Sequence, residues 1–168
     1  MELLCSIGKM NHLAKTPRLM RLILPAKSAF SAALTATARS PEPVTTRETH
    51  MSWVFMTGDH VYKLKKPVLF PYLDFSTLER RATACRAEVS LNRRPAPDVY
   101  LGVVPLTMTP VGYAMGGSGR IVDWLVVMRR LEETQTLEES LKAHKMPQTA
   151  VERLADVLRH IQKRFLTI

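Results

Sequence analysis

The pattern of apolar and polar residues in the first half of the chain predicts a β-hairpin. Residues 52–57 are rich in aromatic and β-branched side chains, which favour strands, and residues 60–65 continue that pattern. Gly58 and Asp59 lie between the two stretches and are typical of a tight turn. The two strands should therefore pair in an antiparallel manner.

A long helix is predicted after this hairpin. Ser76 and Glu79 have the spacing of a capping box, in which the serine is the N-cap. The helix should run to about Arg94, because Pro95 cannot continue it. The positions expected on its buried face are Leu78, Ala82, Cys85, Val89 and Asn92. Glu88 borders this stripe.

The second half of the chain predicts three strands followed by two helices. Strands are predicted at residues 99–108, 113–115 and 121–128, and helices at 137–143 and 148–165. The last helix is amphipathic, and its apolar residues at helical spacing are Val151, Leu154, Ala155, Leu158, Ile161 and Phe165. The predicted fold class is α+β, with a mainly antiparallel sheet of about five strands, one crossing helix and carboxy-terminal helices.

The amino-terminal region differs in composition from the rest. Residues 1–27 form a basic segment in which Arg21 and Pro25 interrupt the apolar residues, so a secretory signal is not expected. A poorly structured start is the preferred interpretation, and a targeting segment is the alternative. Residues 28–43 predict a short Ala-rich helix to Ala38 followed by a Pro-rich linker.

Composition limits the class of protein. The 168 residues are 46% hydrophobic, which suits one globular domain with a loose terminal segment. There is no run of 18 apolar residues, so no membrane span is expected. Two cysteines and five scattered histidines predict neither a disulfide framework nor a metal site, and a reducing, cytoplasmic location fits best.

The net charge of +9 raises the question of nucleic-acid binding. Residues 1–49 carry seven Lys/Arg and three Asp/Glu, so nearly half of the excess lies in the first third of the chain. No basic helix with interleaved aromatic residues and no known nucleic-acid-binding signature occurs. A basic groove that receives polyphosphate explains the charge equally well.

Lys63 and Glu88 are the candidate functional pair. Val61, Lys63 and Lys65 should share one face of their strand, and a lysine on a covered strand needs a partner because a buried unpaired ammonium is costly. The alternative for Lys63 is a solvated edge strand, and for Glu88 an exposed helical acid. Lys65 and Lys66, next to a proline, are expected at the surface.

Two other motifs are interpreted as turns. Residues 116–119, Gly-Gly-Ser-Gly, are not followed by Gly-Lys-Ser/Thr or by a helix, so they predict a hairpin turn rather than a phosphate-binding loop. Asp74 precedes the predicted helix and is expected to be a cap or turn residue, although Asp74-Phe75-Ser76 looks superficially like the kinase Asp-Phe-Gly motif.

Several long and specific motifs resemble the bacterial aminoglycoside-phosphotransferase-like proteins that are often fused to a P-loop ATP-binding domain. The resemblance covers residues 44–131 closely and 132–168 loosely. The motifs that carry it are residues 48–55, 62–68, 73–81, 88–89, 91–94 and 96–105. It implies a protein-kinase-like amino-terminal lobe (N-lobe) with one C-type helix, followed by the start of a helical lobe.

The resemblance also implies a nucleotide site with ATP and magnesium. Lys63 would contact the phosphates, Glu88 would hold Lys63, and Met128 to Leu131 would be the hinge whose backbone meets adenine. The complete set of candidate nucleotide-binding residues is Lys63, Glu88, Lys65, Met128, Arg129, Leu131 and Ser52.

The sequence departs from this family in the catalytic half. A His-Gly-Asp-type catalytic loop and a magnesium-binding Asp are both absent from the chain. We therefore expect a truncated kinase-like protein whose parent activity is ATP-dependent phosphoryl transfer to a small hydroxyl substrate, inactive alone. The alternatives are a module that binds nucleotide, or binds a missing lobe or partner chain through residues 151–165, and less favourably a nucleic-acid-binding protein.

Overall fold

The computed structural model describes residues 30, 31, 34, 43–132, 134, 136–143 and 146–166. The expectations for residues 1–27 lie outside these residues, as does most of the predicted helix and linker at 28–43. The described part divides into two compact units, residues 1–130 and 131–168, which we treat separately. In the first unit, Phe30, Ser31 and Leu34 are helical, as the Ala-rich pattern predicts.

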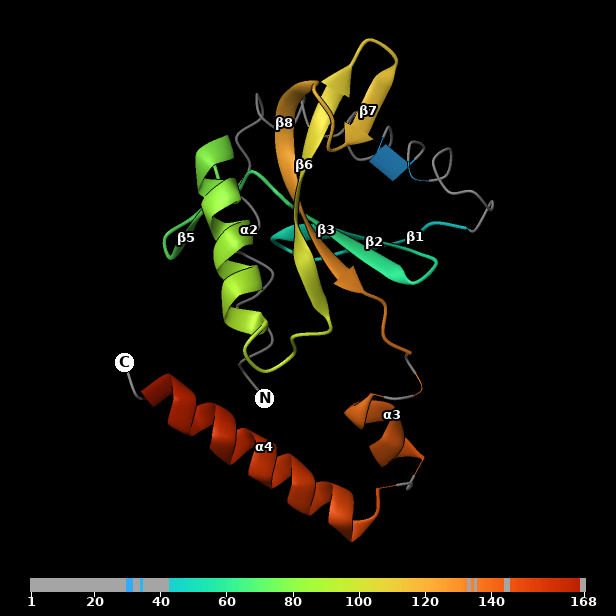
Figure 1. Ribbon diagram of the computed structural model, residues 1–168, viewed down its shortest axis with the longest axis vertical. Helices are drawn as coiled ribbons and strands as arrows, with labels where there is room; N and C mark the ends of the chain where they lie inside the picture. Colours follow the sequence, from blue (N-terminus) through green and yellow to red (C-terminus); the bar gives the residue numbers. More distant parts are fainter. Residues whose placement is uncertain are drawn as a thin grey trace, which may run out of the picture. The chain divides into compact units, whose positions relative to one another are not determined.

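The first unit contains a six-stranded sheet in the order β1-β2-β3-β8-β6-β7 (Figure 1). The strands are β1 (Thr45–Glu48), β2 (Ser52–Thr57), β3 (His60–Lys65), β6 (Tyr100–Thr109), β7 (Gly112–Met115) and β8 (Arg120–Arg129). Every pairing among the described strands is antiparallel. The α+β class is confirmed, but the prediction of about five strands is wrong. The additional strand is β1, whose four residues are all exposed and so show no apolar alternation.

The predicted hairpin and turns are present. Thr57 pairs with His60 across the two-residue turn of β2 and β3, and Gly58 has a φ of 50° that favours glycine. Residues 116–119 connect β7 to β8, as predicted. Gly119 is required there because a Cβ atom would lie 2.5 Å from the carbonyl oxygen of Met108. A second, two-stranded hairpin, β4 (Leu69–Phe70) and β5 (Leu73–Asp74), was not predicted.

Helix α2 (Leu78–Asn92) follows β5 and packs on β6 and β8 (Figure 1). Its N-cap is Thr77, whose side chain accepts from the amide of Arg80, so the prediction that Ser76 is the cap is wrong. Ser76 instead donates its amide and its hydroxyl to Asp74 Oδ1, at 2.9 and 2.6 Å. Asp74 is thus the turn residue that the sequence predicted. Because Ser76 is bonded to Asp74 in this turn, Thr77 is the N-cap and the helix starts one residue later than predicted.

The sheet has an apolar cluster on each face. One cluster is formed by Phe30, Leu34, Trp53, Phe55, Leu64, Leu106 and Leu125. The other is formed by Cys85 and Val89 of α2 with Val126 of β8, and Tyr100, Val103, Trp124 and Met128 pack against it. Because the clusters lie on opposite faces, Leu64 is buried in the first while its neighbours Lys63 and Lys65 face α2.

The second unit contains α3 (Leu137–Lys142) and α4 (Gln148–Leu166), in agreement with the predicted helices. Thr136 caps α3 by accepting from the amide of Glu139. On α4, Val151 and Leu158 are exposed. The side chain of Phe165 is outside the described part. Among the described residues, no helix combines the length and the apolar character needed to cross a membrane.

Candidate functional site

Glu88 of α2 bridges two lysines of β3. Lys63 Nζ donates to Glu88 Oε1 at 2.8 Å, and Lys65 Nζ donates to Glu88 Oε2 at 2.6 Å. The period of two along β3 places both lysines on the face that α2 covers, and the helix presents Glu88 to them. The structure therefore brings together Lys63, Glu88 and Lys65, which we call the β3–α2 cluster.

The three side chains differ in exposure. Lys63 is 30% exposed, Glu88 14% and Lys65 6%. The prediction that Lys65 lies at the surface is wrong, because its ammonium is covered by the ring of Phe75, 4.9 Å away. Lys66 is partly buried and pairs with Glu48 at 2.6 Å. The cluster contains two ammonium groups and one carboxylate, so its net charge is positive. Lys63 is its most exposed side chain.

Electrostatics keep Glu88 ionised. Burial by itself would raise the pKa of Glu88, but the hydrogen bonds from Lys63 and Lys65 and the charges of both lysines lower it below its ordinary value. The ionised carboxylate can therefore hold an ammonium at neutral pH. The alternative that Glu88 is an exposed helical acid is wrong for its side chain, which is 14% exposed and bonded to both lysines. Asn92 does bond to residue 88, but to its backbone carbonyl.

A second ion pair, Arg81–Asp123, attaches the beginning of α2 to β8. Arg81 Nε lies 3.0 Å from both carboxylate oxygens of Asp123, and both side chains are almost fully buried. Arg81 Nη1 also donates to the carbonyls of Phe75 and Ser76. Burial raises the pKa of Asp123 against the opposing effect of Arg81. This pair is not predictable from the sequence, because Arg81 lies in an arginine-rich stretch that gives no sign of burial.

Cys85 lies between the two ion pairs on α2. Its side chain is fully buried, and burial raises the pKa of its thiol to about 11. The sulfur lies 3.8 Å from the carbonyl oxygen of Trp124. A thiol with this pKa is protonated at neutral pH and is a poor nucleophile. Cys85 therefore fills space between helix and sheet, and thiol chemistry is not its role.

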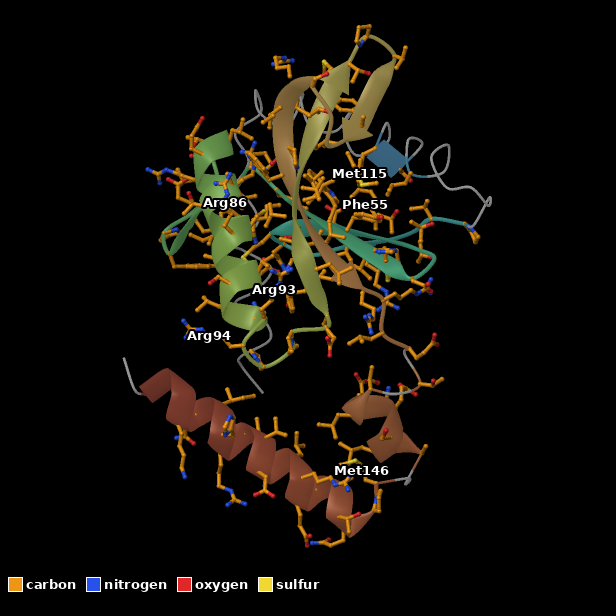
Figure 2. The ribbon with its side chains drawn as sticks, viewed as in Figure 1. Phe55, Arg86, Arg93, Arg94, Met115 and Met146 are labelled. Atoms are coloured by element: carbon orange, nitrogen blue, oxygen red, sulfur yellow. The ribbon has the colours of Figure 1, made fainter. Side chains whose placement is uncertain are left out.

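Arginines attach the rest of α2 to the sheet (Figure 2). The guanidinium of Arg86 lies 4.6 Å from the ring centroid of Trp124. Arg93 Nε donates to the carbonyl of Tyr100 at 2.6 Å, and Arg93 Nη2 donates to that of Leu101. These contacts hold the middle and the carboxy-terminal end of the helix that carries Glu88, and they use two of the basic side chains that contribute to the net charge.

The other predicted residues occupy different positions around the β3–α2 cluster. Met128 pairs with Val61 and so faces the same side of the sheet as Lys63. Ser52 pairs with Lys65 and is 2% exposed, so its side chain is covered. The amide of Arg129 already donates to the carbonyl of Val99 at 2.8 Å. Leu131 is 60% exposed and belongs to the second unit.

No set of metal ligands was found in the part of the chain that the structure describes. Groups of three or more His, Cys, Asp or Glu side chains that could hold a metal ion do not occur among these residues. Glu88 cannot serve as such a ligand while both of its oxygens accept from lysines. The cluster itself is suited to an anion.

Comparison with known proteins identifies relatives but no activity. The chain is 36% identical over 118 residues to uncharacterized proteins of Mycobacterium bovis and Mycobacterium tuberculosis. The alignment covers 70% of this chain and 22% of the relatives, so the chain spans about a fifth of their length. No family model matches the chain. No solved structure matches it.

Proposed function

We propose that the β3–α2 cluster binds the phosphates of ATP and that residues 44–131 form the N-lobe of a kinase-like phosphotransferase. The observation that carries this proposal is the 2.8 Å contact between Lys63 and Glu88, made by a partly exposed lysine in a cluster with excess positive charge. A positioned ammonium of this kind is what a polyphosphate requires.

The arrangement of the elements supports the proposal. In protein kinases the phosphate-contacting lysine lies on the third strand, and its glutamate partner lies on the helix that follows. Here Lys63 is on β3, and Glu88 is on α2, the first helix after it. The sequence pattern predicts Lys63 on a covered strand and Glu88 on the following helix. The family resemblance implies the same pair.

The end of β8 is the proposed position of the adenine. Met128 shares the face of Lys63 and packs against the cluster of α2 and β8. The amide of Arg129 bonds to Val99 and that of Arg130 bonds to Asp59. Leu131 is the first residue beyond these two occupied amides. Within the first unit, the proposed hinge is the segment that begins at Met128.

The residues of the chain can bind and orient phosphates, but they do not supply the transfer step. Magnesium would enter with ATP and neutralise phosphate charge. The sequence has no His-Gly-Asp-type loop to activate a hydroxyl and no matching Asp to hold the metal. Because transfer needs both positioning and charge stabilisation, we expect this chain alone to bind ATP without transferring a phosphate. The proposed parent activity is transfer to a small hydroxyl substrate.

Calorimetric titration of the full chain with magnesium-ATP tests this proposal. We expect saturable binding, and we expect Lys63→Met to weaken it by about tenfold or more, because one charge-assisted hydrogen bond to phosphate is lost. The matched control is Lys66→Met, which removes the same charge from a residue that pairs with Glu48 instead. It should change the affinity by no more than about twofold.

Two results would contradict nucleotide binding at this site. One is the absence of saturable binding to the wild-type chain. The other is equal affinity in the wild type and in Lys63→Met. Phosphate transfer from magnesium-ATP above background, catalysed by the isolated chain, would contradict the expectation that it binds without catalysis.

A protein-binding module is the second candidate function. The observation in its favour is the apolar side of α4, where Val151 is 45% and Leu158 56% exposed. Such a surface is typical of a helix that contacts another polypeptide. The same titration distinguishes the two candidates, because a module of this kind would bind no ATP and would be indifferent to Lys63→Met.

A further inference from the structure

We propose that Lys65 is a positioning residue, which stays bonded to Glu88 while the ammonium of Lys63 moves onto the ligand. This inference rests on the proposed function and deepens it. It assigns different tasks to two lysines of the same strand that bond to the same carboxylate.

The two lysines differ in how deeply their side chains are buried. Lys65 is 6% exposed and Lys63 is 30% exposed. Among the described residues, Glu88 is the carboxylate recorded within ion-pair distance of Lys65, at 2.6 Å. A buried ammonium that loses its counter-ion is strongly disfavoured, whereas a partly exposed one can be solvated. Lys65 and Glu88 should therefore stay paired, and Lys63 is the member that can leave.

The geometry allows Lys63 to leave without disturbing the other contact. Lys63 bonds to Oε1 of Glu88, and Lys65 bonds to Oε2. Each lysine thus has an oxygen of its own. The ammonium of Lys65 is also fixed by the Phe75 ring, 4.9 Å away. The Lys65–Glu88 contact can remain in place while Lys63 moves to a phosphate oxygen.

The charge of the cluster explains why a second lysine is useful. If Glu88 had Lys63 as its sole partner, the movement of Lys63 to a phosphate would leave a partly buried carboxylate close to an anion. Such an arrangement is disfavoured by like-charge repulsion and by desolvation. With Lys65 in place, Glu88 stays neutralised and the phosphate meets the remaining positive charge of Lys63. The ligand class that this arrangement favours is a polyphosphate.

Carbon-13 NMR titration of the glutamate carboxyl groups tests this assignment without any nucleotide. The Glu88 signal is identified as the one missing in Glu88→Gln. We expect Lys65→Met to raise the pKa of Glu88, and to raise it more than Lys63→Met does, because the contact with Lys65 is the more buried one. A larger rise in Lys63→Met, or no rise in Lys65→Met, would overturn the proposal.

Affinity for magnesium-ATP gives a second measurement. Lys65→Met should weaken binding about tenfold, and Lys65→Arg should restore most of the loss, because arginine keeps the charge. If Lys65→Met does not fold, Lys65→Gln replaces it in both measurements. Lys65→Met or Lys65→Gln with wild-type affinity would overturn the positioning role. If the wild-type chain binds no ATP, the proposed function fails, and the order of the two pKa changes still decides whether Lys65 or Lys63 holds Glu88.

Discussion

At the scale of single residues, one carboxylate determines the chemistry of the site. Glu88 accepts from two lysines that lie on the same strand, and its side chain is only 14% exposed. A single carboxylate cannot neutralise two ammonium groups, so the cluster keeps a positive charge. This excess makes the cluster suited to a phosphate.

The stability that Glu88 contributes should depend on pH. The lysines lower the folded pKa of Glu88 below its unfolded value, so its contribution is fully present above the unfolded pKa and is lost as the pH falls through the folded pKa. We expect Glu88→Gln to lower the free energy of unfolding by about 1–3 kcal/mol at about pH 7 and by much less at about pH 3. Urea unfolding at the two pH values measures this difference.

Glu138→Gln is the matched control for this comparison. Glu138 also bonds to a lysine, Lys142 at 2.8 Å, but it is 76% exposed on α3. An exposed pair of this kind contributes little, so the control should differ from the wild type by less than about 1 kcal/mol at both pH values. A Glu88→Gln effect that is equally large at low pH would contradict the ionised bridge.

The sequence predicts part of this site but not all of it. Lys63 and Glu88 are predictable because a lysine on a covered strand needs a partner and the next helix offers one. Lys65 shares the face of Lys63 by strand period, but its ammonium is also covered by the ring of Phe75, and no strand or helix pattern of the sequence predicts that contact. Arg81 is not predictable either, because its partner Asp123 lies 42 residues away.

At the scale of elements, the attachment of α2 to the sheet decides where Glu88 lies. Arg81 connects the first turn of the helix to β8 and to the segment before the helix. Cys85 and Val89 follow at helical spacing and pack on Val126. Glu88 lies on the same side of α2, so any displacement of the helix also displaces the carboxylate.

We expect Arg81→Met to lower the free energy of unfolding by about 3–5 kcal/mol, because it leaves the buried Asp123 carboxylate without its partner. The double variant Arg81→Met/Asp123→Leu should recover much of this loss, since no buried charge remains. Urea unfolding measures both. The neighbouring control, Arg80→Met, removes an arginine whose side chain is 56% exposed and pairs with Asp74, and it should cost less than about 1 kcal/mol. A loss equal to that of Arg80→Met would show that the Arg81–Asp123 pair does not hold the helix.

Strands and helices were predictable where the local sequence has a clear pattern of apolar residues. Strands β2 and β8 are rich in apolar and β-branched residues, α2 carries apolar residues at helical spacing, and the structure confirms these elements together with β3. Strand β1 has four exposed residues and owes its conformation to pairing with β2. The start of α2 differs from prediction by one residue, because Asp74 binds Ser76 in a turn and Thr77 becomes the cap.

At the scale of the whole molecule, the basic residues that give the net charge of +9 have different roles. Lys63 and Lys65 surround Glu88, Arg81 is paired inside the fold, and Arg93 bonds to the backbone of β6. These four basic side chains of the first unit therefore serve its structure or the proposed phosphate site.

The two units should also differ in how readily their backbone opens. Strand β8 lies between β3 and β6, and Leu125 and Val126 within it are fully buried. Helix α3 has no buried residue among its six, all of which the structure describes. Local opening requires less free energy where few apolar contacts are lost, so amides of α3 should exchange with deuterium at least about 100-fold faster than those of β8. Hydrogen–deuterium exchange of the full chain, followed by mass spectrometry, measures both segments in one experiment. Equal protection of α3 and β8 would contradict this expected difference in local stability between the two units.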